Sequence, residues 1–226
     1  MASRSLSRRA ALPRCRIAGM PTDAQDLPLS NIVDDLAEQG WSLQPLFAPN
    51  ALTLELAEEC RRRAARGALT PAGVGKAQEV REGIRGDRIE WLDPGQSAAC
   101  DRYLALLDEL RLTLNRGLFL GLEDYESHFA LYPPGAFYQK HLDRFRDDDR
   151  RAVSVVLYLN PDWQPEHGGA LRLYLADGST RDIAPQAGSL VAFLSAEMLH
   201  EVLPTTRERL SLTGWFRRRG ADPLQP

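Results

Sequence analysis

The chain of 226 residues is long enough for one large domain, and its 43% hydrophobic and 26% charged residues are ordinary for a globular protein with a buried core. A net charge of −3 argues against nucleic acid or an acidic membrane surface as a partner. No apolar run approaches the length of a membrane-spanning helix. The three cysteines are widely spaced and form neither a zinc motif nor a disulfide framework, so we expect a cytoplasmic protein.

The N-terminal segment differs from the remainder of the chain. Its first residues, MASRSLSRRAALPRCRIAGM, are rich in arginine and serine, contain no acidic residue, and lack the continuous apolar stretch of a secretory signal. This composition also fits an organelle transit peptide, or a chain whose true first residue is Met20. We expect residues 1–25 to be a disordered basic tail and residues 26–219 to form one domain.

Three segments before residue 122 have the apolar spacing of amphipathic helices: 29–41, 48–69 and 97–122. Between the second and the third, residues 73–95 contain too many glycines and charges for a helix interior. They predict a long loop that leads into a short strand, RIEWL. We expect the helices to form a layer, within residues 26–122, that covers one face of a sheet.

After residue 122 the apolar pattern changes to short runs of β-branched and aromatic residues, separated by Gly, Pro, Asn and Asp. The eight runs are YESHFALYPP, AFYQKHLD, RAVSVVLYLN, GALRLYLA, TRDIAP, GSLVAFLS, HEVLP and RLSLTGWF. Even spacing of many short strands is typical of a β-sandwich or barrel. The predicted fold class is therefore α+β, with a double-stranded β-helix (jelly-roll) core at residues 123–219.

A histidine and a carboxylate lie two residues apart at the end of one predicted strand. Side chains at this spacing point to the same face, so His141 and Asp143 can both reach one metal ion. His200 begins another predicted strand, and strands distant in sequence share one barrel mouth in a jelly roll. Two imidazoles and one carboxylate form the facial triad of non-haem Fe(II) oxygenases. On its own, however, an H-x-D pair is more often a surface feature than a metal site.

Arg209 follows His200 by nine residues and lies in an apolar predicted strand. A buried guanidinium needs an anionic partner, because an unpaired buried charge is costly. A dicarboxylate co-substrate supplies one, since one carboxylate can chelate the iron while the other pairs with the guanidinium. The alternative is an internal salt bridge to one of the acidic residues of the chain.

Five motifs in order along the chain resemble those of the 2-oxoglutarate- and Fe(II)-dependent prolyl 4-hydroxylases that act on hypoxia-inducible factor. They are IRGDRIEWL (84–92), YPPGAFYQKHLD (132–143), VLYLNPDW (156–163), GGALRLY (168–174) and HEVLPTTRERLSLTGWF (200–216). The resemblance covers roughly residues 26–219 and is closer still to the bacterial members, which act on elongation factor Tu. It implies an oxygenase domain that uses Fe(II), 2-oxoglutarate and O2, with ascorbate as reductant. The implied reaction hydroxylates a prolyl C4 in a protein and releases succinate and CO2.

The resemblance also implies roles for individual side chains. The Fe(II) ligands would be His141, Asp143 and His200. The 2-oxoglutarate site would contain Arg209, Tyr158, Tyr132 and Thr213. The protein substrate would meet Tyr138, Trp215, Arg85, Asp87 and Arg151, and the segment REGIRGDR would belong to a mobile loop that closes over it. Leu142 and Gly214 stand where relatives carry other residues, which bears on the shape of the pocket.

Three other functions are compatible with parts of the pattern. A small-molecule hydroxylase on the same fold, acting on free proline or another metabolite, predicts that peptides bind no better than the free amino acid. A non-catalytic jelly-roll binding module has no use for the complete triad together with Arg209. A zinc hydrolase with two histidines and an aspartate as ligands also gives Arg209 no role.

Overall fold

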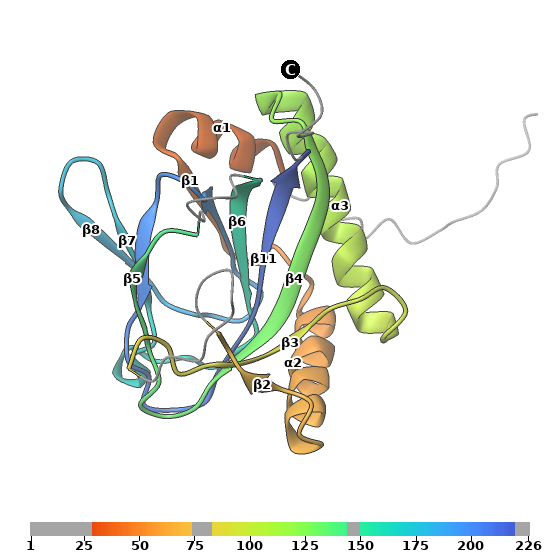
Figure 1. The fold of residues 1–226 in the computed structure, drawn as a ribbon, viewed down its shortest axis with the longest axis vertical. Helices are drawn as coiled ribbons and strands as arrows, with labels where there is room; N and C mark the ends of the chain where they lie inside the picture. Colours follow the sequence, from red (N-terminus) through yellow and green to blue (C-terminus); the bar gives the residue numbers. More distant parts are fainter. Residues whose placement is uncertain (1–28, 74–82, 144–149, 220–226) are drawn as a thin grey trace, which may run out of the picture.

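The computed structural model describes residues 29–73, 83–143 and 150–219 (Figure 1). The predicted basic tail at 1–25 and residues 74–82, the first part of the predicted long loop 73–95, lie outside these ranges.

The three predicted helices are confirmed: α1 (Leu29–Gln39), α2 (Asn50–Ala65) and α3 (Ala98–Leu118). The first ends at Gln39, as the glycine that follows it in the sequence predicts, because Gly40 adopts a left-handed conformation (φ +78°) and the next residue begins a strand. At the start of α3, the Ser97 hydroxyl accepts a hydrogen bond from the backbone N–H of Cys100. The left-handed Phe119 ends α3 before the predicted residue 122.

All eight strands predicted after residue 122 are present. They are β4 (Leu122–Tyr132), β5 (Tyr138–His141), β6 (Arg151–Tyr158), β7 (Leu171–Tyr174), β8 (Thr180–Ile183), β9 (Leu190–Leu194), β10 (Leu199–Val202) and β11 (Arg209–Arg218). The predicted strand RIEWL is β3 (Arg88–Trp91), and a short 3-10 helix, η1 (Pro165–His167), precedes β7. Two strands were not predicted, β1 (Trp41–Gln44) and β2 (Thr70–Pro71).

The described strands form two antiparallel sheets, which confirms the α+β jelly-roll prediction. The larger sheet has the order β1-β9-β6-β11-β4-β3-β2, and the smaller sheet has the order β5-β10-β7-β8. Figure 1 shows the smaller sheet on one side of the larger sheet and helices α2 and α3 on the other side. The segments before β4 therefore contribute strands to both edges of the larger sheet as well as the helical layer.

The apolar side chains form two clusters, one on each side of the larger sheet. The first lies between that sheet and the helices and includes Leu36, Leu56, Leu107 and Phe216. The second lies between the two sheets and is smaller and more aromatic, with Tyr132, Tyr158 and Phe193 among its members. Among the described helices, none has the length and apolar character needed to cross a membrane.

Candidate functional site

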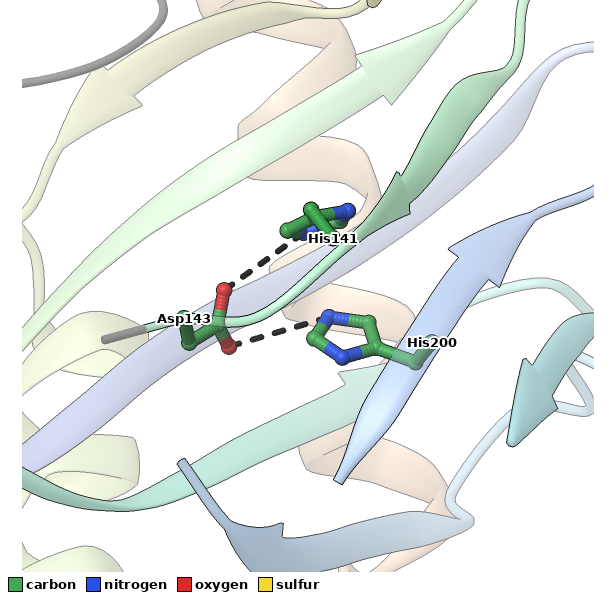
Figure 2. A group of neighbouring side chains, drawn as sticks. All are labelled: His141, Asp143 and His200. Atoms are coloured by element: carbon green, nitrogen blue, oxygen red, sulfur yellow. Dashed lines mark ion pairs between the residues drawn. The ribbon is translucent and has the colours of Figure 1, made fainter. Parts of the chain in front are cut away.

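Two histidines lie directly opposite each other in the smaller sheet. β5 pairs with β10 so that His141 is the cross-strand partner of His200. Asp143 follows β5, two residues after His141, and its carboxylate lies between the two imidazoles (Figure 2). Its oxygens are 3.5 Å from Nε2 of His141 and 3.8 Å from Nε2 of His200. The ligand atoms of all three residues lie within 4.8 Å of one another, so the structure brings together the predicted metal ligands.

Each histidine is oriented by a backbone carbonyl two residues earlier in the chain. Nδ1 of His141 lies 2.7 Å from the carbonyl oxygen of Gln139, and Nδ1 of His200 lies 2.9 Å from that of Met198. A carbonyl oxygen can only accept, so each Nδ1 donates and each Nε2 keeps its lone pair for a metal. Burial lowers the pKa of His200 to about 4, which leaves this imidazole neutral near pH 7.

The carboxylate of Asp143 is held by the larger sheet. The hydroxyl of Ser154 donates to Asp143 at 2.7 Å and lies 2.9 Å from the hydroxyl of Ser195. Burial alone raises the pKa of the Asp143 carboxyl, but His200, His141 and the Ser154 hydrogen bond outweigh burial and hold it well below its ordinary value. An ionised carboxylate beside two imidazole Nε2 atoms is a donor set that fits Fe(II).

The triad opens into a pocket between the two sheets. Besides the three ligands, the pocket is lined by the predicted residues Arg85, Asp87, Tyr132, Tyr138, Arg151, Arg209, Thr213 and Trp215. Tyr158 is the one predicted site residue that does not line it. Its ring lies 5.2 Å from the guanidinium carbon of Arg209, and its buried hydroxyl has no hydrogen-bond partner in the described part of the chain. Burial raises the pKa of Tyr158 to about 12, so the hydroxyl keeps its proton as a donor.

Arg209 is a buried cation without an acidic partner among the described residues. Its side chain is 1% exposed, and its Nε donates to the carbonyl oxygen of Gly169 at 2.8 Å. The guanidinium carbon lies 4.9 Å from the Tyr132 ring. Within the described ranges, no carboxylate pairs with this guanidinium, so the structure gives no support to an internal salt bridge. A buried guanidinium beside the unpaired Tyr158 hydroxyl fits the distal carboxylate of 2-oxoglutarate.

Arg85 and Asp87, which both line the pocket, form an ion pair in which the carboxylate is buried. The guanidinium donates to both carboxylate oxygens of Asp87, at 2.7 and 2.5 Å. Its carbon lies 4.4 Å from the centre of the Tyr138 ring, and that ring stacks on the His141 imidazole at 3.7 Å. The pair therefore connects the segment before β3 to a metal ligand, and its contact with a peptide remains a prediction.

Arg151 also has an internal partner, because its guanidinium donates to Glu126 at 2.9 Å and lies 3.5 Å from the centre of the Trp215 ring. Several lining residues of the pocket were not predicted, and the two with ring side chains that contact Trp215 are Trp91 and His128. The His128 ring lies 5.0 Å from that of Trp91 and 5.6 Å from that of Trp215. Burial lowers the pKa of His128 to about 4. The sequence did contain a signal for His128. Side chains alternate along a strand, so His128 lies on the same face of β4 as the predicted pocket residue Tyr132.

Comparison with known proteins agrees with this geometry. The family model described as the 2OG-Fe(II) oxygenase superfamily matches residues 127–217. The solved structure of a prolyl-4-hydroxylase from Pseudomonas putida is 65% identical, covers 85% of this chain and all of that chain, and has a TM-score of 0.80. A prolyl hydroxylase from Trichoplax adhaerens, solved with a peptide of the hypoxia-inducible-factor oxygen degradation domain, is 27% identical with a TM-score of 0.78. That likeness covers 84% of this chain and 89% of the other.

Curated prolyl hydroxylases from animals also match this chain, at a lower sequence identity than the Pseudomonas putida protein. The hypoxia-inducible factor prolyl hydroxylase of Caenorhabditis elegans is 29% identical over 82% of this chain, and the human Egl nine homolog 1 is 28% identical over 87%. The matched region spans 28% and 48% of the length of these two relatives.

Proposed function

Because the chain belongs to the 2OG-Fe(II) oxygenase superfamily and is a 2-oxoglutarate-dependent dioxygenase of the prolyl 4-hydroxylase type, we propose that it hydroxylates C4 of a prolyl residue in a protein. We further propose elongation factor Tu as that protein and the cytoplasm as its location. The observation that carries the proposal is the triad of His141, Asp143 and His200 in one pocket with the buried Arg209, which pairs with no carboxylate of the described residues. Of the described cysteines, Cys60 and Cys100 are buried free thiols, which is compatible with a reducing compartment.

Different residues of the pocket bind the metal and the co-substrate in this proposal. The triad holds Fe(II), and Arg209 receives the distal carboxylate of 2-oxoglutarate, with the Tyr158 hydroxyl as a second donor. When both are bound, they activate O2 to hydroxylate a C–H bond, and 2-oxoglutarate leaves as succinate and CO2. Tyr132 and Thr213 line the co-substrate side of the pocket. The carbonyl-bound Nδ1 atoms keep both imidazole rings in place during turnover.

The aromatic wall of the pocket is suited to a prolyl ring. Tyr138 and Trp215 line the pocket beside the metal ligands, and Trp91 lies next to Trp215 with ring centres 6.3 Å apart. Apolar rings around the target C–H bond keep water away from the reacting centre. The Trichoplax relative was solved with a bound peptide, which supports a substrate of peptide size. Elongation factor Tu is proposed on the resemblance to bacterial members, and the 65% identical relative is bacterial.

The experiment is an aerobic assay of succinate release from 2-oxoglutarate with Fe(II) and ascorbate, with and without purified bacterial elongation factor Tu. We expect elongation factor Tu to stimulate succinate release and to gain the mass of one oxygen atom on one proline. The Asp143→Ala variant is the control and should produce neither signal. Stimulation by free proline instead of the protein would favour the small-molecule hydroxylase. Iron binding without any turnover would favour the non-catalytic binding module.

A further inference from the structure

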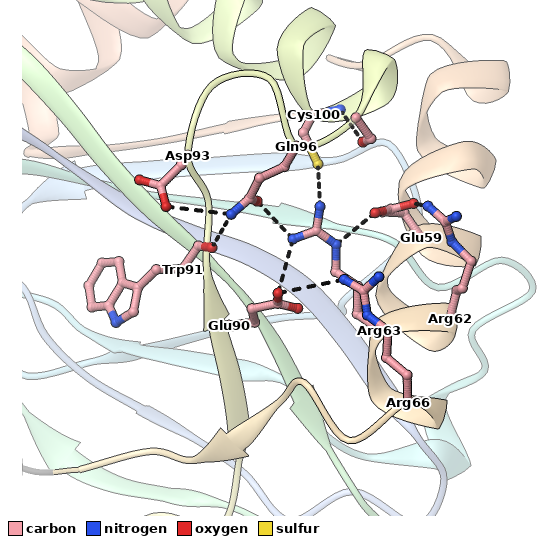
Figure 3. Close-up of polar contacts among 10 residues, drawn as sticks. Glu59, Arg62, Arg63, Arg66, Glu90, Trp91, Asp93, Gln96 and Cys100 are labelled. Atoms are coloured by element: carbon pink, nitrogen blue, oxygen red, sulfur yellow. Dashed lines mark hydrogen bonds and ion pairs between the residues drawn. The ribbon is translucent and has the colours of Figure 1, made fainter.

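A buried arginine lies outside the pocket, on the helix side of the larger sheet. Arg63 of α2 is 1% exposed. Its Nε donates to Glu59 at 2.7 Å, one terminal nitrogen donates to the Gln96 side chain at 2.8 Å, and the other lies 3.6 Å from the sulfur of Cys100 (Figure 3). One guanidinium therefore joins α2, the loop before α3 and the first turn of α3.

Both Arg63 and its partner Gln96 also contact strand β3. The terminal nitrogen that binds Gln96 also lies 3.5 Å from a carboxylate oxygen of Glu90 in that strand. The Gln96 amide donates in turn to the backbone carbonyl of Trp91 at 3.3 Å. Since side chains alternate along a strand, Ile89 and Trp91 line the pocket while Glu90 points toward the helices. Arg63 thus holds β3 from the face opposite the pocket.

β3 has little other support on its outer side. It has four residues, and its outer neighbour β2 has only two. Yet β3 determines one wall of the pocket, because Trp91 contacts the rings of His128 and Trp215. Asp87 lies immediately before β3, and its ion pair with Arg85 leads to Tyr138, which stacks on a metal ligand. A small displacement of β3 would move all of these groups.

We propose that Arg63 is a positioning residue for substrate binding, which acts by fixing β3 and therefore Trp91; this inference rests on the proposed function. Stability alone is a weak reason for such a residue, because the desolvation of a buried ion pair offsets most of its attraction. A planar guanidinium with donors in several directions instead specifies one arrangement of the elements around it. The expected role is therefore in geometry, and it affects the protein substrate more than the co-substrate.

The test compares Arg63→Met and Gln96→Met with Arg61→Met. Gln96 is exposed, so its replacement cuts the contact to Trp91 without opening the core. Arg61 lies on the same helix and pairs with Glu208 instead of β3, so it is the matched control. For the first two variants we expect the KM for elongation factor Tu to rise about tenfold. The KM for 2-oxoglutarate and the succinate formed without protein substrate should stay at wild-type values, and Arg63→Lys should restore part of the loss.

Hydrogen exchange of the β3 amides provides a readout that does not depend on the substrate. Exchange across Arg88–Trp91 should be faster in Arg63→Met and Gln96→Met and unchanged in Arg61→Met. Wild-type exchange in both test variants would overturn the inference, as would an unchanged KM for the protein or an equal rise in the KM for 2-oxoglutarate. If the wild-type enzyme does not hydroxylate elongation factor Tu, the proposed target fails separately, and the exchange rates still decide the role of Arg63.

Discussion

At the scale of single residues, the role proposed for Arg209 predicts that co-substrate binding and metal binding can be separated. Arg209 is buried and touches no metal ligand by any hydrogen bond in the described part of the chain, so Arg209→Met should leave Fe(II) binding intact. Hydrogen bonds to a charged group contribute about 1.5–3 kcal/mol, so the KM for 2-oxoglutarate should rise about 10- to 100-fold. The measurement is succinate formation against 2-oxoglutarate concentration, together with an Fe(II) titration.

The control for Arg209→Met is Arg207→Met, which lies two residues earlier. The Arg207 guanidinium lies 5.2 Å from the Trp163 ring and is not among the pocket-lining residues. An unchanged 2-oxoglutarate KM in Arg209→Met, or an equal rise in the control, would show that another side chain binds the distal carboxylate.

The site was partly predictable from single residues. His141 and Asp143 share a face through a spacing of two, and Arg209 was marked by its charge within an apolar strand. Trp91 and His128 were not predicted, because tryptophan in a strand and histidine among apolar residues are common in ordinary cores. Their part in the pocket depends on the packing of β3 and β4 side by side, which is a tertiary arrangement. The internal ion pairs of Arg85 and Arg151 also depend on folding.

At the scale of elements, the pairing of β11 with β4 requires a glycine. Gly214 lies opposite Ser127, and a side chain on it would collide with the Tyr125 hydroxyl and approach the carbonyl oxygen of Glu126 to 2.6 Å. The carbonyl belongs to the strand backbone and cannot move aside. Gly214→Ala should therefore lower the free energy of unfolding by about 1–3 kcal/mol, measured by urea denaturation with an unchanged slope.

Gly117 of α3 provides a comparison for the prediction on Gly214, because its close neighbour is a side chain and not the backbone. A side chain on Gly117 of α3 would collide with the side chain of Val33, so Val33→Ala should rescue Gly117→Ala. Tyr125→Phe should not rescue Gly214→Ala, because the Glu126 carbonyl remains in place. Full rescue by Tyr125→Phe would contradict the backbone explanation.

The helices and the later strands were predictable because their apolar residues follow a clear period. β1 was not predicted, because its four residues, WSLQ, are too few to show a clear period. Its alternate residues Ser42 and Gln44 are buried and both donate to Asp35. β2 has only two residues, which is too short for any period.

At the scale of the whole molecule, the metal centre joins the two sheets. His141 and His200 belong to the smaller sheet, while Asp143 is anchored by Ser154 of the larger sheet. Metal bound only by the folded protein stabilises it by about 2.7 kcal/mol at a hundredfold excess over Kd, which corresponds to roughly 5–10 °C for a chain of this size. Removing the metal with a chelator should lower Tm by this amount, measured by calorimetry.

The Asp143→Ala variant is the control for metal removal. Its Tm should not respond to Fe(II) or to the chelator, because one of the three ligands is lost. A metal-dependent Tm in this variant would place the stabilising ion at a different site. An unresponsive wild-type protein would mean that the metal does not hold the sheets together.

The segment before β3, residues 83–86, also affects how a polypeptide could bind to the smaller sheet. The backbone N–H of Gln139 donates to the carbonyl of Ile84 at 2.8 Å, and that of Gly86 donates to Phe137 at 3.0 Å. Residues 83–86 thus occupy the outer edge of β5, the strand that carries a metal ligand. A polypeptide cannot extend the smaller sheet by β-augmentation there, because the backbone groups that it would pair with are already taken. At this edge, recognition of the proposed protein substrate would therefore rest on side-chain contacts within the pocket and not on an added strand.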